Sequence, residues 1–148
     1  MSRAKRIEPV KGIAENAERQ LAVSLVACEQ RVSEAQAKLL ELERYRQEYQ
    51  QQFTQRVGGG MGVTNLRDYQ AFIARLGEAV RQQQAIVQRA CAQRDAERRR
   101  WQDAARKSRA IGHVISKWQA DEQRIQEQHE QRSSDERAQR RRSDGVME

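Results

Sequence analysis

The sequence predicts an all-α fold, a long antiparallel two-helix coiled-coil hairpin joined by a Gly-rich turn. Apolar residues make up only 37% and aromatic residues 5% of the 148 residues, which is too little for the wide core of a globule. Ala, Leu, Glu, Gln and Arg are abundant, and all are strong helix formers. Apolar residues recur at heptad spacing in two stretches, separated by a cluster of four glycines.

The first helix is expected over residues 9–57, after an N-terminal extension over residues 1–8. Its apolar residues are separated by alternating steps of four and three residues, which is the a/d pattern of a coiled coil. They are Leu21, Leu25, Cys28, Val32, Ala35, Leu39 and Leu42, with a looser continuation through Tyr45, Tyr49 and Phe53. Pro9 suits the first turn of this helix, where its missing N–H is not needed.

Residues 58–63 are expected to form the turn. Glycine adopts positive φ without steric cost, so the first helix should end after Arg56 or Val57. Thr64 or Asn65 would then cap the second helix, because their side-chain oxygens accept bonds from free N–H groups.

The second helix is expected over residues 64–130. Its heptad pattern is interrupted by Arg94 and Glu97, resumes at Trp101 and stops after Ile125. Its members are Leu66, Tyr69, Ile73, Leu76, Val80, Gln83, Val87, Ala90, Trp101, Ala104, Ser108, Ile111, Ile115 and Trp118. Residues 131–148 carry mixed charge without a seam, so we expect a frayed or disordered tail.

An antiparallel hairpin fixes which residues face each other. If Phe53 faces Leu66, the pairs are Leu42 with Leu76, Val32 with Val87, Cys28 with Ala90 and Cys91, Ala17 with Trp101, and Ile7 with Ile111. Leu21 and Leu25 would then meet Glu97 and Arg94, so we expect bending or local opening there.

The second helix should run past the start of the first, leaving an apolar stripe of Ile111, Val114, Ile115 and Trp118. Two interpretations stay open. Residues 2–8 could cover the stripe, for example as an extra helical turn. The stripe could instead dock another protein, since exposed apolar patches often do so.

The net charge of +7 favours an acidic partner. Residues 94–109 hold seven basic and three acidic side chains. A solvated helix face is the first interpretation, an acidic protein surface the second and nucleic acid the third. A nucleic-acid-binding coiled coil and a homo-oligomeric scaffold therefore remain alternative functions.

No catalytic, cofactor-binding or metal site is expected. His113 and His129 lack a cluster of ligands at metal spacing. The segment GGGMG lacks the GK[ST] ending and the preceding strand of a phosphate loop. Cys28 and Cys91 are expected to be reduced thiols close together across the hairpin, where a disulfide under oxidation is conceivable. No signal peptide or transmembrane segment is recognisable, and the protein is expected to be cytoplasmic.

The segments LLELERYRQEYQQQF and TNLRDYQAFIARLGEAV flank the glycines and resemble the FliJ family of flagellar type III export proteins. The resemblance is specific over residues 36–83. It is carried before the turn by Leu42, Tyr45, Glu48 and Tyr49, and after it by Asn65, Tyr69, Gln70, Phe72, Ile73 and Leu76.

The resemblance implies a non-enzymatic coiled coil similar to the central stalk of rotary ATPases. It implies three partners: the hexameric flagellar export ATPase, whose ring assembly it promotes, the cytoplasmic domain of the export gate, and export chaperones. It implies no nucleic acid and a place at the cytoplasmic face of the inner membrane, held at the flagellar base through partners only.

Two sets of residues follow from the resemblance. The gate-facing surface would consist of Lys38, Leu42, Tyr45, Tyr49, Phe72, Leu76, Ala79 and Gln83. Phe72 lies one step off the seam and should be more exposed than its neighbours. The surface facing the ATPase ring would consist of Arg94, Arg98, Arg99, Arg100, Trp101, Ile111, Ile115 and Trp118.

Overall fold

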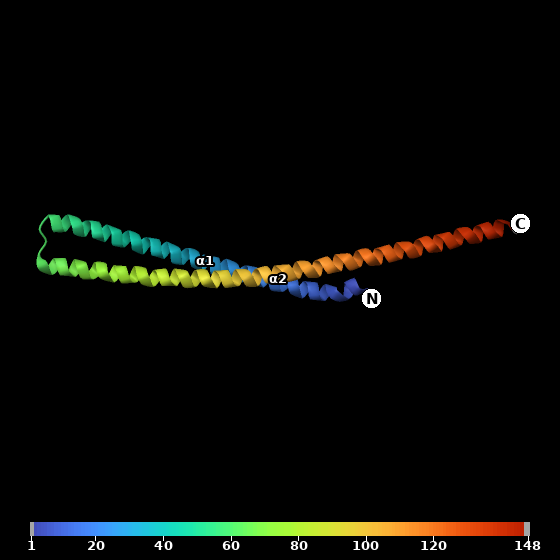
Figure 1. Ribbon diagram of the computed structural model, residues 1–148, viewed down its shortest axis with the longest axis horizontal. Coiled ribbons are helices and arrows are strands. Elements are labelled where there is room, and N and C mark those ends of the chain that lie inside the picture. The colour runs from blue at the N-terminus through green and yellow to red at the C-terminus, as the bar shows by residue number, and fades with distance from the viewer. Residues whose placement is uncertain (1, 147–148) are drawn as a thin grey trace. The chain divides into compact units, whose positions relative to one another are not determined.

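The computed structural model describes residues 2–146, and the regular secondary structure of this part of the chain is entirely helical. α1 runs from Arg3 to Gly58 and α2 from Val63 to Val146. The two long helices pack against each other as a hairpin (Figure 1). The predicted all-α hairpin is therefore confirmed.

The contacts divide the chain into two compact units. The hairpin unit is Gln20–Gln102, and it contains the end of α1 and the start of α2. The terminal unit combines the start of α1, as far as Arg19, with α2 from Asp103 onward.

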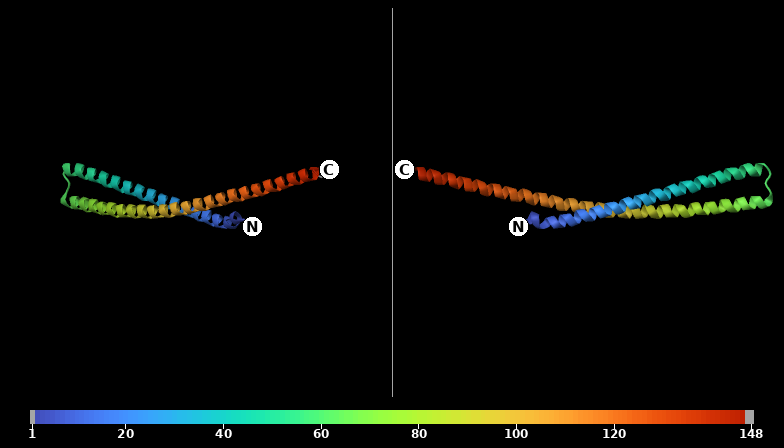
Figure 2. Two further views of the ribbon diagram at one scale, coloured as in Figure 1. Left: turned by 45° about the vertical axis from the view of Figure 1, so that its right-hand side comes forward. Right: turned by 180° about the vertical axis from the view of Figure 1, so that it is seen from behind.

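In the hairpin unit, the predicted heptad seam forms the buried face between the two helices. Figure 2 shows the backbones of these helices from two further sides. The buried residues are Cys28, Val32 and Ala35 of α1, and Leu76, Val80 and Gln83 of α2. Within each helix these residues are separated by steps of four and three, so the seam follows one stripe of each helix.

A hydrogen bond fixes the register of the hairpin unit. The Gln83 side-chain amide donates to the backbone carbonyl oxygen of Ala35 at 3.0 Å. This contact agrees with the expected pairing of Val32 with Val87. Ala35 lies three residues after Val32 and Gln83 lies four residues before Val87, as two antiparallel helices require. Nearer the link, the ring centroids of Phe53 and Tyr69 lie 6.0 Å apart, and Tyr69 is three residues from the expected Leu66.

Residues 59–62 connect the two helices. The Gly59 N–H donates to the carbonyl oxygens of Gln55 and Arg56, each at 3.2 Å, which closes the last turn of α1. Gly60 has a φ of 85°, a conformation that L side chains rarely adopt. The Leu66 N–H donates to the Gly62 carbonyl oxygen at 3.0 Å, so Gly62 occupies the N-cap position of α2. The prediction that Thr64 or Asn65 is the N-cap is wrong, because both lie inside the first turn.

α1 begins earlier than the sequence pattern suggests. Ser2 caps it, since its side-chain oxygen accepts from the Lys5 N–H at 3.3 Å. Pro9 therefore lies inside the helix. Because proline has no backbone N–H, the carbonyl oxygen of Lys5 receives no helical hydrogen bond from residue 9. The separate extension predicted over residues 1–8 is wrong for residues 3–8, which are helical, while Met1 lies outside the described residues.

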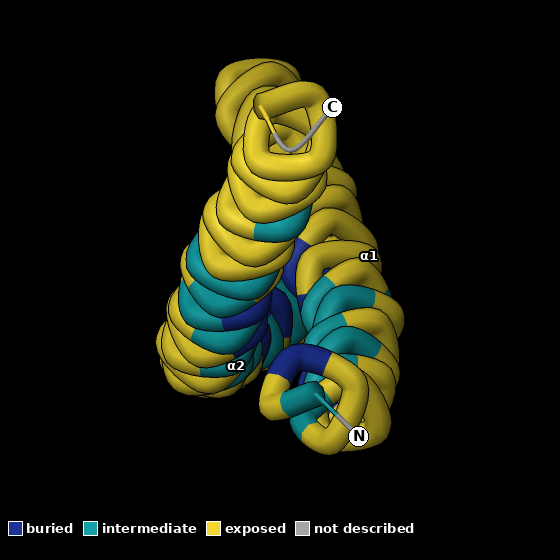
Figure 3. The backbone as a smooth tube through the Cα atoms, turned by 90° about the vertical axis from the view of Figure 1, so that its right-hand side faces the viewer, coloured by how far each residue is buried: buried dark blue, intermediate teal, exposed yellow. Residues whose placement is uncertain are grey.

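α2 continues to Val146, well beyond the predicted end at residue 130. The expectation of a frayed or disordered tail over residues 131–148 is wrong as far as Val146, and residues 147–148 lie outside the described part. Arginine is the commonest residue of this segment and favours helix without tertiary contacts. Its side chains are almost all exposed, as Figure 3 shows for the last turns of α2.

In the terminal unit, small residues form most of the buried face. The buried residues are Ala4 and Ala14 of α1, and Ala105, Ser108 and Ile115 of α2. The expected register is displaced here by about one to two helical turns. Ile111 lines a depression with Val10 and Ala14, whereas Ile7 lines another with Trp118, so the predicted pairing of Ile7 with Ile111 is displaced.

Candidate partner-binding surfaces

Five aromatic residues gather near the link of the hairpin unit. Tyr45, Tyr49 and Phe53 follow one another at four-residue spacing on α1, so they share one face of that helix. Tyr69 and Phe72 approach from α2. Ring centroids lie 4.5 Å apart between Tyr49 and Phe72 and 5.5 Å apart between Tyr49 and Tyr69. Tyr49 is therefore the centre of a continuous aromatic cluster, in which such pairs add to the energy of burial.

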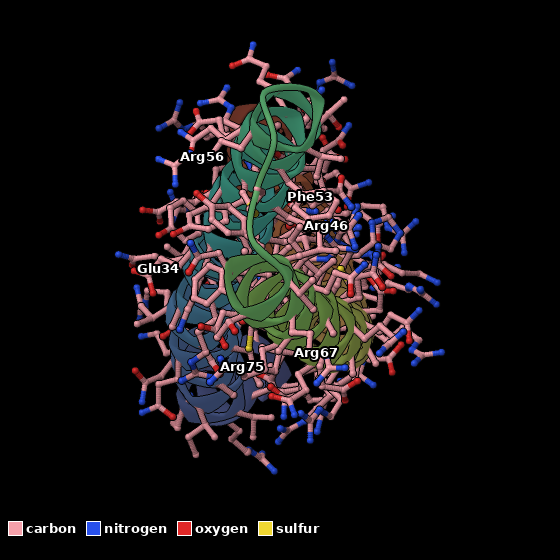
Figure 4. All side chains as sticks on the ribbon, turned by 90° about the vertical axis from the view of Figure 1, so that its left-hand side faces the viewer. Glu34, Arg46, Phe53, Arg56, Arg67 and Arg75 are labelled. Atoms are coloured by element: carbon pink, nitrogen blue, oxygen red, sulfur yellow. The ribbon has the colours of Figure 1, made fainter. Side chains whose placement is uncertain are left out.

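Arginine side chains lie over the outer rings of this cluster. The Arg56 guanidinium is 5.3 Å from the centroid of the Tyr69 ring, and that of Arg75 is 5.9 Å from the Phe72 ring. Figure 4 looks along the hairpin from this end and labels both arginines with Phe53. Phe72 is consequently half-buried, packed between Tyr45, Tyr49 and Arg75, and is less exposed than its position beside the seam suggested.

The predicted gate-facing set does not form one exposed surface. Lys38 and Tyr45 are exposed, and Tyr45 keeps 45% of its surface accessible. Four members are half-buried, namely Leu42, Tyr49, Phe72 and Ala79. Leu76 and Gln83 are buried in the seam. The part of this set that a partner can reach in the closed hairpin is therefore the ridge that runs from Lys38 to Tyr45 and Phe72.

The basic residues of the predicted ATPase-facing set in the hairpin unit are largely paired with acids of the same chain. Arg94 lies 3.1 Å from Asp95, and Arg100 lies 2.6 Å from Glu97. Arg98 reaches Glu29 of α1 at 3.8 Å. The Arg98 pair is exposed on both sides, and such pairs contribute little to stability. They do reduce the local positive potential, which supports the interpretation of a solvated helix face.

Glu97 lies where the seam was expected to be weak. A hydrogen bond from Ser24 of α1 and the neighbouring Arg100 lower the pKa of its carboxyl group below the usual 4.5. Its second oxygen, Oε2, is shielded from solvent and has no hydrogen-bond partner among the described residues. Leu21 and Leu25 are half-buried beside it. A polar contact thus replaces apolar packing at this level, and bending there stays a prediction.

The second part of the ATPase-facing set, Ile111, Ile115 and Trp118, belongs to the terminal unit, and α1 covers it. The Arg3 guanidinium lies 5.1 Å from the centroid of the Trp118 ring, and Ile7 lines the same depression. The backbone N–H of Ala4 donates to Oε1 of Glu122 at 3.5 Å. Of the two open interpretations, the structure shows the first, in which the start of α1 covers the stripe as additional helix.

The described residues contain no cluster of three or more metal-binding side chains. His113 and His129 are both exposed, and Cys28 and Cys91 are free thiols. Within residues 2–146, neither helix has a window apolar enough to span a bilayer.

Sequence reasoning missed two features. The first is the hydrogen bond between Glu122 and the first turn of α1, which depends on tertiary structure. The sequence indicates only that the first N–H groups of a helix need acceptors, and it does not indicate which residue supplies one. The second is an exposed heptad on the outer side of α1, which the search for a seam passed over although its spacing is visible in the sequence.

Two long packed helices, with charged outer faces and an aromatic cluster at the link, define a coiled-coil protein whose surfaces are suited to binding other proteins. Residues 3–145 match the family model described as the flagellar FliJ protein, so the chain belongs to the FliJ family. The chain is thus a non-enzymatic component of flagellar export. No curated protein and no solved structure gives a match.

Proposed function

We propose that this chain is a central-stalk-like component of the flagellar export apparatus, located in the cytoplasm and held at the inner membrane through its partners. It would associate with the hexameric export ATPase, promote assembly of the ATPase ring and couple the ring to the export gate. It would also bind export chaperones. Membership of the FliJ family over nearly the whole chain is the observation that carries this proposal.

The proposed gate-binding surface is the ridge from Lys38 through Tyr45 to Phe72. Its support is the exposure of Tyr45 and Lys38 beside a rigid aromatic cluster, since anchored aromatic side chains often dominate binding energy. Leu76 and Gln83 support the ridge from within the seam. Leu42, Tyr49 and Ala79 would contribute the edges that remain accessible.

The proposed ATPase-binding surface includes Arg98, Arg99 and Arg100. Exposed ion pairs exchange readily for pairs with a partner because each is weak. Trp118, with Ile111 and Ile115 beneath it, would act through the start of α1 that covers it.

The first test is ATP hydrolysis by the cognate export ATPase, titrated with this protein, while ring formation is followed by electron microscopy. We expect saturable stimulation and more rings. The triple variant R98E/R99E/R100E should require a higher concentration for the same effect, whereas Arg44→Glu, an exposed arginine on α1, should not. Absence of both stimulation and co-migration would contradict the proposal.

A second test separates the gate surface from the seam. Tyr45→Ala should weaken binding to the isolated cytoplasmic domain of the gate and leave helicity unchanged. Ile86→Ala, another partly exposed apolar residue of the hairpin unit, is the matched control. Leu76→Ala is a poorer probe because Leu76 is buried and its loss also weakens the seam. Equal affinity for Tyr45→Ala and the unaltered protein would remove the ridge assignment.

A further inference from the structure

The outer side of α1 in the hairpin unit carries a second heptad. Six uncharged residues follow each other by steps of three and four: Val23, Val26, Gln30, Ser33, Ala37 and Leu40. We call these residues the outer stripe. All six are exposed, and the fractional exposure is 71% for Val23, 61% for Val26 and 51% for Leu40.

The outer stripe points away from α2. Gln30 and Ser33 lie two positions from the buried Cys28 and Ala35, and two positions correspond to about 200° around a helix. The seam therefore leaves the stripe uncovered. From Val23 to Leu40 the stripe is about 25 Å long, which is enough for one further helix of four to five turns.

The charges beside the outer stripe are mostly acidic. Glu29 and Glu43 lie on one side of it, and Glu34 and Glu41 lie on the other. Glu29 is paired with Arg98 of α2, so Glu34 and Glu41 form the more open side of the border. The basic residues of this stretch of α1 are Arg31 and Lys38, on the side nearer the seam, and the exposed Arg44, which lies at the Leu40 end of the stripe. Arg31 there contacts the sulfur of the buried Cys28 at 3.9 Å. In a protein with a net charge of +7, this face is locally acidic.

A depression of about 670 Å³ lies at the Leu40 end of the stripe. Its apolar lining comes from Ala37, Leu40, Leu42 and Tyr45, and its charged lining comes from Glu41, Arg44 and Glu48. Glu34, labelled in Figure 4, belongs to the same acidic border. A depression of this kind accepts a large apolar side chain and places carboxylates within reach of a neighbouring cation.

We propose that the outer stripe binds a basic amphipathic helix of a partner protein, to form a three-helix assembly with α1 and α2. The apolar residues of that helix would repeat at heptad spacing and its Lys or Arg residues would flank them. The heptad spacing of the stripe matches the apolar residues of such a helix, and the acidic border matches its basic residues. This surface adjoins the proposed gate-facing ridge at Tyr45, which lines the depression, and the proposed ATPase-facing set at Glu29, which pairs with Arg98.

The probes are two synthetic helical peptides of about 18 residues, one of leucine and lysine and one of leucine and glutamate, in the same heptad pattern. Binding of each labelled peptide to the full chain is measured by fluorescence anisotropy at low and moderate salt. We expect the lysine peptide to bind at least about ten times more tightly than the glutamate peptide. The net positive charge of the protein favours the glutamate peptide. Tighter binding of the lysine peptide would therefore show that the local acidic border determines the preference.

Two double variants locate the binding site. V26K/L40K and E34K/E41K should each weaken lysine-peptide binding by about ten-fold, because they remove the apolar contacts and the acidic border. The matched control I86K/E78K alters one exposed apolar and one exposed acidic residue of α2 and should bind as the unaltered protein does. Circular dichroism checks that all three remain folded.

Three results would overturn the proposal. They are equal binding of both peptides, equal weakening by I86K/E78K, and a dimer of the unaltered protein in sedimentation velocity that V26K/L40K dissociates. The last result would show that a second copy of this chain occupies the stripe. None of these measurements uses an export protein, so their outcome is independent of the proposed stalk-like function.

Discussion

The buried faces of the two units are built from residues of different size. In the hairpin unit, Val32, Leu76 and Val80 fill the seam, and aromatic rings extend it toward the link. In the terminal unit, alanine and serine occupy most buried positions, and Ile115 is the main large exception. Both faces follow heptad spacing, so the difference lies in how much apolar surface each position removes from water.

A heptad pattern therefore determines which face of each helix is buried. It does not determine whether buried apolar area or contacts at the margin stabilise that face. Large residues stabilise a seam through buried apolar area. Small residues bury little area, so the terminal unit depends more on contacts at its margin. These contacts are the ring of Trp118 under Arg3, the Ser2 cap and the Glu122 carboxylate at the first turn of α1.

The largest effect should come from a charge placed in the seam of the hairpin unit. Val32→Asp buries a carboxylate that has no basic partner in the seam, and we expect a loss of roughly 3 kcal/mol or more in the free energy of unfolding. Urea denaturation followed by circular dichroism measures it. Val23→Asp on the outer side of α1 is the control and should change stability by about 0.5 kcal/mol or less. Similar losses for both would mean that the seam is not the source of stability.

The next effect tests the margin of the terminal unit. Trp118→Ala removes the ring that Arg3 and Ile7 contact, and we expect a local loss of about 1–3 kcal/mol, less than for a fully buried tryptophan. Hydrogen exchange should show faster exchange of amides in residues 3–10 and unchanged exchange around Val80. His113→Ala, at an exposed position of the same helix segment, should change neither. Unchanged protection of residues 3–10 in Trp118→Ala would show that the ring does not hold α1.

A smaller effect tests the hydrogen bond that fixes the register. Gln83→Ala removes the donor to the Ala35 carbonyl oxygen and should cost about 1 kcal/mol. The neighbouring Gln84 is exposed, so Gln84→Ala should have almost no effect on the urea midpoint. Equal midpoints for the two variants would mean that the buried amide contributes nothing net.

The smallest effect concerns pH. The pKa of Glu97 is lowered in the folded protein, so its contribution to stability is present above the unfolded value of 4.5 and is lost as the pH falls through the folded pKa. The carboxyl carbon of Glu97 should therefore titrate below pH 4.5 in an NMR experiment. Ser24→Ala should move that midpoint upward, because it removes the largest cause of the shift. A midpoint at or above 4.5 in the unaltered protein would contradict the assignment.

Much of the fold can be predicted from sequence because the helical period converts residue spacing into a face. The seam from Cys28 to Val80 is obtained in this way. The helix ends cannot be obtained from the helical period, because they depend on capping residues. Ser2 is followed three residues later by Lys5 and not by the Glu or Gln of a capping box, so Pro9 gave the stronger signal for a helix start.

The candidate surfaces are predicted less completely. The heptad already places Leu76 and Gln83 in the seam, while the family resemblance places them on the gate-facing surface, and the structure shows both buried. The position of Ile7 beside Trp118 could not be obtained from the pattern. It depends on a displacement of register within the terminal unit, and small seam residues such as Ala4 and Ala14 specify register only weakly.

The link at residues 59–62 has a consequence for the order of folding. Phe53 and Tyr69 are joined by a short segment, whereas Ala4 and Glu122 are 118 residues apart along the chain. Loop-closure entropy makes the distant contact costlier to form first, by about 2 kcal/mol in an unstructured chain. We therefore expect the helices to zip together from the aromatic cluster outward. Alanine substitutions at Phe53 should slow refolding, and substitutions at Trp118 should mainly speed unfolding.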